Sequence, residues 1–147
     1  MIDNTRLVSV GKILDELTSY GEDYLKYIVV VFGMNSEDCG IFGLQQDEDG
    51  LLRLGIDWMG WFDCWGYCYS VEELIQDLSS FDRDVKVYLD SPWAIFTFAN
   101  HHCIFSEPNE DREYIAADAI TLEEKKESQE EDISIIDVIT NSNTIFF

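Results

Sequence analysis

The feature that most constrains the fold of this chain is the segment 26–33, Lys-Tyr-Ile-Val-Val-Val-Phe-Gly. Its residues are β-branched, aromatic and apolar at consecutive positions, so a strand built from them has two faces to bury. Strands of this kind lie in the interior of a sheet, with other elements packed on each side. The segment therefore predicts a central strand around which the rest of the chain is arranged.

Two other segments have the apolar spacing of amphipathic helices. Between Val10 and Leu17 the apolar residues recur at intervals of three and four, and Gly21 follows as a stop signal. The residues 70–73, Ser-Val-Glu-Glu, match a capping box and precede a second apolar stripe that ends at Leu78. We predict a helix for each segment. The outward face of the second helix carries three acids, Glu72, Glu73 and Asp77.

Two hairpins are also indicated. The runs 39–46 and 51–58 flank Asp-Glu-Asp-Gly at 47–50, and Asp-Gly is suited to the positive φ of tight turns. The runs 84–90 and 93–98 alternate around Ser-Pro at 91–92, and a continuation of the second run to Phe105 is compatible with the pattern. We expect both hairpins to belong to the sheet of the central strand.

The remaining sequence has weaker signals. The segment 107–132 contains eleven acidic and three basic residues, and Thr-Leu-Glu-Glu at 121–124 resembles another capping box, so we expect an exposed helix or a mobile loop there. The apolar runs 133–139 and 144–147 are expected to return to the sheet. Residues 1–147 are thus predicted to form one acidic α+β domain, with a single mainly antiparallel sheet of five to seven strands and two or three helices.

The charge of the chain restricts its partners. Against 30 Asp and Glu stand nine Lys and Arg, which gives a formal net charge of −21. A negative field of this size repels nucleic-acid phosphates and anionic membranes and steers basic proteins toward the surface. We therefore expect a basic protein partner and no direct contact with nucleic acid or membrane. The N-terminal sequence has no secretory pattern and the apolar runs are short, so a cytoplasmic location with reduced cysteines and no disulfide is expected.

Soft metal ligands occur in the chain, but their spacing does not match a zinc site. Cys64 and Cys68 form one loose pair, the residues 101–103 are His-His-Cys, and Cys39 stands apart. We interpret the cysteines as buried thiols and predict no metal or cofactor. A nucleophile and base made of Cys103 and His102 is disfavoured because neighbours on a strand point to opposite faces and the acidic field opposes a thiolate.

Other catalytic patterns are equally weak. Asp57 and Asp63 beside Trp58 and Trp61 resemble a sugar-hydrolase site in composition, but ordinary surface and core residues explain the same letters. The turn at 47–50 fails as a calcium loop because glutamine and isoleucine fall at its ligand positions. We find no nucleotide-binding or hydrolase motif, and we expect a protein that is not an enzyme.

These observations favour an acidic inhibitor, most naturally an immunity protein that neutralises a bacterial toxin, for example a basic nuclease, by masking its cationic active cleft. One alternative is a nucleic-acid mimic that inhibits a defence or restriction protein. Another is a small-ligand-binding domain or enzyme that uses the aromatic segment 58–69. The sequence leaves the identity of the partner and the oligomeric state open.

The predicted contact residues are acids on turns and helix faces, with tryptophans as anchors. They are Asp47, Glu48, Asp49, Trp58, Trp61, Glu72, Glu73, Asp77, Glu107, Glu110, Asp111 and Glu113.

Overall fold

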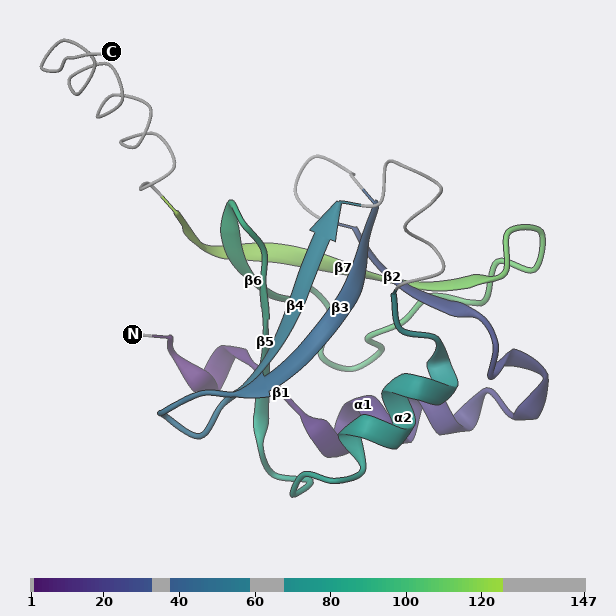
Figure 1. Ribbon diagram of the computed structural model, residues 1–147, viewed down its shortest axis with the longest axis horizontal. Helices are drawn as coiled ribbons and strands as arrows, with labels where there is room; N and C mark the ends of the chain where they lie inside the picture. The colour runs from purple at the N-terminus through teal and green to yellow at the C-terminus, as the bar shows by residue number, and fades with distance from the viewer. Residues whose placement is uncertain (1, 33–37, 59–67, 126–147) are drawn as a thin grey trace, which may run out of the picture.

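The computed structural model describes residues 2–32, 38–58 and 68–125 of the chain. These residues form two α-helices, two short 3-10 helices and seven β-strands (Figure 1). The helices are η1 (Asn4–Arg6), α1 (Val10–Ser19), η2 (Glu22–Tyr24) and α2 (Val71–Leu78). The strands are β1 (Val8–Ser9), β2 (Ile28–Phe32), β3 (Asp38–Gln46), β4 (Leu52–Trp58), β5 (Lys86–Asp90), β6 (Ala94–Phe98) and β7 (Tyr114–Glu124).

The strands form one mixed sheet in the order β1-β5-β4-β3-β2-β7-β6. The sheet closes into a barrel because β5 also pairs with β6, where Leu89 lies opposite Phe96. Five of the seven strand pairings in the described residues are antiparallel, and the pairings of β2 with β7 and of β4 with β5 are parallel. The predicted α+β class, the mainly antiparallel pairing and the predicted numbers of strands and α-helices are therefore confirmed for the described residues, whereas the closure of the sheet was not predicted.

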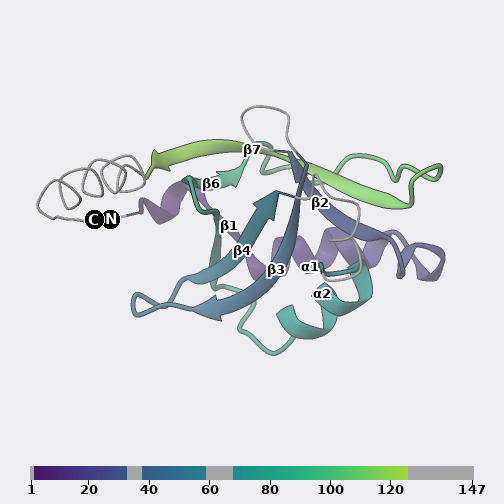
Figure 2. The ribbon, with the colours of Figure 1, turned by 45° about the horizontal axis from the view of Figure 1, so that its top comes forward.

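Both α-helices lie on the same side of the closed sheet and contact each other (Figures 1 and 2). Helix α2 lies in the connection between β4 and β5. Because these two strands are parallel, the chain must cross from the end of one to the start of the other, and a helix is the usual form of that crossover. Within the described residues, neither helix has the length and apolar character that crossing a membrane requires.

The predicted capping box of the second helix and the predicted turn of the first hairpin are confirmed, and α1 also begins with a capping serine that was not predicted. Ser9 Oγ accepts a hydrogen bond from the N–H of Lys12 at 3.2 Å and so caps α1. Ser70 and Glu73 exchange both bonds of the predicted capping box, at 3.2 and 3.0 Å. Gly50 has a φ of 84° in the turn between β3 and β4, a conformation that glycine adopts without steric cost.

The predicted central strand is β2, which lies between β3 and β7. Val29 and Val31 belong to the main core, whereas Val30 is buried on the other face in a small cluster with Cys68 and Ala116. Both faces of the strand are thus covered, as its uninterrupted apolar sequence predicted.

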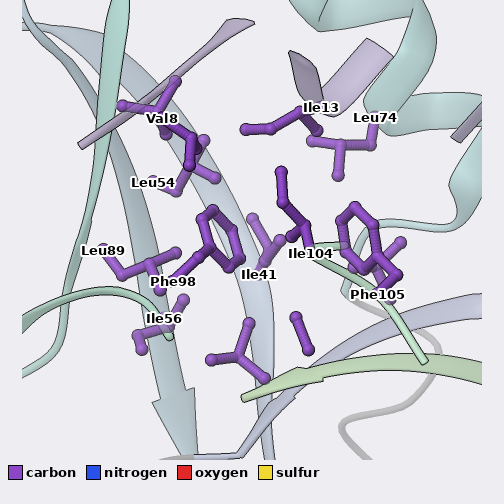
Figure 3. Close-up of a cluster of buried hydrophobic side chains, with 14 of the residues drawn as sticks. Val8, Ile13, Ile41, Leu54, Ile56, Leu74, Leu89, Phe98, Ile104 and Phe105 are labelled. Atoms are coloured by element: carbon purple, nitrogen blue, oxygen red, sulfur yellow. The ribbon is translucent and has the colours of Figure 1, made fainter. Parts of the chain in front are cut away.

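The main core fills the interior of the closed sheet and extends to the helices. Figure 3 shows Phe98 among Leu54, Leu89 and Ile41 from the strands, with Ile13 and Leu74 approaching from α1 and α2. Residues of the loop after β6, Ile104 and Phe105, complete the cluster from the side of β7. The apolar faces of both helices are therefore buried against the same interior that the strands enclose.

The prediction for 107–132 is wrong where the structure describes a strand, at Tyr114–Glu124. This segment is β7, which pairs with β2 over 114–118 and with β6 over 119–124. Its capping-box letters at 121–124 do not start a helix, because the hydrogen bonds offered by a neighbouring strand outweigh a weak local preference. Asp118 and Ile120 are exposed and alternate with buried Ala117 and Ala119, but this alternation is not visible in the sequence because one of the exposed residues is isoleucine.

The second hairpin is confirmed for β5 and β6, but β6 ends at Phe98 and does not continue to Phe105. Residues 99–103 form a turn, and Phe105 makes an isolated bridge to Ala117 of β7. The predicted return of 133–139 and 144–147 to the sheet lies outside the described residues.

Candidate functional site

An exposed phenylalanine marks the most distinctive surface of the described residues. The register of β3 against β4 shifts between Ile41 and Gly43, which leaves Phe42 as the extra residue of a β-bulge. Its side chain remains 37% exposed, and a hollow lies on each side of it. We call this surface the Phe42 face and define it by Phe42, Asp57, Trp58, Glu73, Gln76 and Asp77.

The larger hollow, which we call the glycine groove, has a volume of about 550 Å³. Its floor is the outer surface of the sheet where Gly43 pairs with Gly55. A Cβ added to Gly43 would meet nothing within 4 Å, and one added to Gly55 would meet its nearest atoms only at 3.9 Å. The walls include Phe42 and Trp58, which is 43% exposed, as well as Pro92.

A group of three charges lies at one end of the glycine groove. Arg53 of β4 donates from Nε to Asp90 Oδ2 of β5. Lys125 Nζ lies 2.6 Å from Asp90 Oδ1 and donates to the carbonyl of Ser91 at 2.7 Å. Burial alone would raise the pKa of Asp90, but the hydrogen bonds and charges of Lys125 and Arg53 outweigh it and hold this pKa below its ordinary value. Asp90 is therefore ionised and stabilises both cations.

The smaller hollow, which we call the helix groove, has a volume of about 390 Å³ and lies between Phe42 and α2. It is lined by Phe42, Cys68, Tyr69, Glu73, Gln76 and Asp77. The Tyr69 hydroxyl donates to Asp77 Oδ2 at 2.6 Å, and burial together with this carboxylate raises the pKa of Tyr69 to about 12. The carboxylates of Glu73 and Asp77 thus lie beside the exposed ring of Phe42.

Of the three acids in the first hairpin turn, Asp47 stabilises the turn itself. Asp47 Oδ1 accepts the N–H groups of Asp49 and Leu51, at 2.9 and 3.0 Å, and its Oδ2 accepts the Tyr88 hydroxyl at 3.1 Å. Asp47 is half-buried, whereas Glu48 and Asp49 are exposed at the tip of the turn. Only these last two side chains are available to a partner without disturbing the turn.

The acids after β6 lie at the other end of the molecule from that turn (Figures 1 and 2). Glu110 accepts a hydrogen bond from the Tyr24 hydroxyl at 2.9 Å, which is the main cause of the raised pKa of Tyr24. Glu107, Asp111 and Glu113 are exposed, and Glu113 has a φ of 61° in the turn that leads into β7. The predicted contact acids therefore do not form one patch.

Of the predicted contact residues, Trp58, Glu73 and Asp77 lie on the Phe42 face, and Glu72 is next to them on α2, 3.9 Å from Lys26 Nζ. Trp61 lies outside the described residues, and so do Asp63 and most of the aromatic segment 58–69. The structure adds Phe42, Arg53, Asp90 and Lys125, which were not predicted. The sequence Ile-Phe-Gly at 41–43 was the available signal for Phe42, because consecutive apolar residues before a glycine interrupt strand alternation.

Three of the four cysteines, Cys39, Cys68 and Cys103, are described and lie in different parts of the fold, whereas Cys64 lies outside the described residues. Cys39 is buried in the main core and Cys68 in the cluster of Val30, as expected of structural thiols. For Cys103 the prediction of a buried thiol is wrong, because this residue lies in the turn that follows β6 and is exposed beside His101 and His102. Across residues 2–32, 38–58 and 68–125, no group of three or more His, Cys, Asp or Glu side chains is placed to hold a metal ion.

The pKa values of three partly buried tyrosines predict how the stability of the fold depends on alkaline pH. Burial is the main cause that raises the pKa of Tyr20, Tyr69 and Tyr88 to about 12, and nearby acids add to it. A raised pKa means that the folded state holds the proton more tightly, so this stabilisation is complete below the unfolded pKa of about 10 and is lost as the pH rises toward 12.

We therefore expect the free energy of unfolding to fall between about pH 10 and about pH 12, and to fall less steeply in Tyr88→Phe. Urea unfolding followed by circular dichroism at several pH values measures both slopes. Because loss of the bond to Asp47 lowers the stability of the variant at every pH, the slopes and not the absolute values are compared. Equal slopes for the two proteins would contradict the assignment of Tyr88.

Comparisons of the chain with protein-family models, with curated proteins and with solved structures found no match.

Proposed function

We propose that this protein is an acidic binding protein that neutralises a basic protein partner, as an immunity protein neutralises a bacterial toxin. The proposal is carried by one observation, the exposed ring of Phe42 between two grooves with carboxylates beside it. Asp57 lies on the side of the glycine groove, and Glu73 and Asp77 lie on the side of the helix groove.

This arrangement suits a cationic protein surface for two reasons. Aromatic side chains, phenylalanine included, are enriched at the buried centre of protein interfaces, and a few well-packed side chains there supply most of the binding energy. Carboxylates around them form charge-assisted hydrogen bonds with Lys and Arg, the groups that hold phosphates in a nuclease cleft. The net charge of −21 adds long-range attraction, which accelerates association with a basic protein.

The acids at the two ends of the molecule have a different role in this proposal. Glu48 and Asp49 at the hairpin turn, and Glu107, Asp111 and Glu113 after β6, are exposed but lie apart from the Phe42 face (Figure 1). We assign them to the general field that steers the partner, since exposed charges outside a contact change the association rate more than the affinity.

The test is a capture experiment with matched baits. The whole purified protein, Phe42→Ala and Asp57→Asn/Asp77→Asn are immobilised, exposed to extract of the native organism at low and then at moderate salt, and the retained proteins are identified by mass spectrometry. The double variant Glu48→Gln/Asp49→Asn also removes two negative charges, but at the hairpin turn and not on the Phe42 face, and serves as the control.

We expect one basic protein to be retained at moderate salt by the wild type and by the control. Removal of an anchor side chain costs about 2 kcal/mol or more, so Phe42→Ala should bind that protein about 30-fold more weakly in a direct titration. Retention that depends on Glu48 and Asp49 but not on Phe42 would contradict the proposed contact surface.

The captured protein also decides between two kinds of inhibitor. A toxin supports the immunity role, whereas a restriction or defence protein whose nucleic-acid site is occupied supports a nucleic-acid mimic. If every captured protein is released together as the salt rises, the binding is nonspecific and the inhibitor proposal is wrong.

A further inference from the structure

The glycine groove contains two cations, which is unusual in a chain with so few basic residues. Only nine Lys and Arg residues occur in 147, yet two of them, Arg53 and Lys125, meet at the single carboxylate of Asp90. The two cations exceed that acid by one charge at this end of the groove. Asp57 is also part of the groove but lies beyond Gly55, so the cationic and acidic ends are separated along β4.

Arg53 has donors that the fold does not use. Its Nε is bonded to Asp90, but its two terminal nitrogens make no hydrogen bond with residues 2–32, 38–58 or 68–125. These nitrogens lie 3.9 and 4.0 Å from the position that a Cβ on Gly55 would occupy, so they border the space above the groove floor. Two terminal guanidinium nitrogens in this position match the two oxygens of a carboxylate.

The floor is bare although the fold does not require glycine there. Neither Gly43 nor Gly55 has a positive φ, and a Cβ at either position would meet no atom closer than 3.9 Å. Glycine within a strand costs stability relative to residues with side chains. The paired glycines therefore keep a flat area of backbone open at a stability cost, and the cavity of about 550 Å³ above it is of the size that holds small molecules.

The walls of the groove suit a ring. Phe42 and Trp58 are both exposed large apolar side chains, at the bulge of β3 and at the end of β4, and Pro92 stands across the groove on the turn after β5. Aromatic and proline side chains around a flat floor favour a planar ligand, which can stack on them and on peptide groups.

We propose that the glycine groove is a binding site for a planar aromatic carboxylate. The carboxylate is held by the terminal nitrogens of Arg53 beside Lys125, and the ring lies over Gly43 and Gly55 between Phe42 and Trp58. A hydroxyl or amine at the far end of the ring faces Asp57, which accepts its hydrogen bond. This site differs in chemistry from the contact with a basic partner, because the cations of the groove hold the charge of its ligand, although Asp57 belongs to both surfaces.

The experiment titrates hydroxynaphthoate into the full-length protein at low salt and follows binding by calorimetry and by protein NMR. Hydroxynaphthamide is the matched neutral probe, since it has the same shape without the charge. We expect the amide to bind about tenfold more weakly or worse, because the charge-assisted pairing with Arg53 is lost. Equal binding of acid and amide, or no binding of the acid up to its solubility limit, would overturn the proposal.

Two variants assign the site. Arg53→Lys keeps the charge but removes the fork, and should weaken binding of the acid about tenfold. Gly55→Val raises the floor, and its Cβ meets no atom closer than 3.9 Å, so it should abolish binding while the β-branched residue keeps the melting temperature level or raises it. Ile120→Ala removes an exposed apolar side chain elsewhere on the sheet and should leave binding unchanged. Unchanged binding in a folded Gly55→Val, or a loss in Ile120→Ala equal to that in Gly55→Val, would show that the probe does not occupy the groove.

The two proposals can fail separately. Loss of partner capture in Asp57→Asn/Asp77→Asn tests the basic partner, and loss of hydroxynaphthoate binding in Arg53→Lys tests the groove ligand. A protein that captures a basic partner and ignores the aromatic acid retains the first function alone, and the reverse result retains the second alone.

Discussion

Replacement of Phe98 by alanine is expected to lower the free energy of unfolding by about 3–5 kcal/mol. Phe98 is 1% exposed and points into the closed sheet, where its ring lies among Leu54 and Leu89 and 6.0 Å from the ring of Phe105 (Figure 3). Strands paired on both sides cannot move inward to fill the space that the ring leaves. The loss therefore combines the transfer free energy of the ring with the cost of a cavity.

Urea unfolding monitored by circular dichroism measures this effect, and the slope of the transition should stay the same if only stability changes. Phe42→Ala is the matched control, because it removes the same ring from a position that is 37% exposed. We expect a cost below about 1 kcal/mol for the control, in line with substitutions at exposed positions. Similar losses for the two variants would contradict the closed, packed interior.

Replacement of Asp90 by asparagine is expected to lower the free energy of unfolding by about 2–3 kcal/mol. The carboxylate is 13% exposed and stabilises Arg53 and Lys125, and without its charge both cations remain at the groove with no counterion there. Loss of one partner from a fully buried pair costs about 3–5 kcal/mol, and we expect less here because the Arg53 and Lys125 side chains are 39% and 25% exposed. Thermal and urea unfolding at neutral pH measure the loss.

The dependence of the free energy of unfolding on acidic pH provides a second test of the role of Asp90. Because its pKa in the folded protein is below the ordinary value, its stabilisation is complete above the unfolded carboxyl pKa and is lost as the pH falls through the folded pKa. Asp90→Asn should lack this component of acid destabilisation, so the difference between the two proteins should shrink as the pH falls. Asp118→Asn, at an exposed position on β7, is the control with little effect. A constant difference between wild type and Asp90→Asn at all pH values would contradict this role.

Local chemistry explains why several elements could be predicted without the structure. Ser9 and Ser70 each satisfy a backbone N–H at the start of a helix, and this bond forms between residues three positions apart. Gly50 adopts the positive φ of a hairpin turn that the preceding acids also favour. The uninterrupted apolar residues of β2 required cover on both faces whatever supplied it.

The strand β7 could not be predicted from short-range sequence patterns. Six of its eleven residues, 114–124, are alanine or acidic, types that are depleted in strands, and they outnumber the strand formers Tyr114, Ile115, Ile120 and Thr121. The strand forms because β2 and β6 present unpaired backbone groups on each side of it, and its pairing with both closes the sheet. The conformation of residues 114–124 is therefore determined by contacts between segments that are distant in the sequence.

The candidate sites likewise combine features set by the local sequence with features set by tertiary contacts. The sequence alone determined the acidic surface, the two helices, the hairpins and the central strand, because charge, capping bonds and hydrophobic period act over a few residues. Only the tertiary structure placed Asp77 of α2 beside Phe42 of β3. It also placed Arg53 of β4 and Lys125, which follows β7, around Asp90 of β5. Their proximity depends on strand order, the bulge at Phe42 and the closure of the sheet, which are set by long-range backbone pairing and packing of the core.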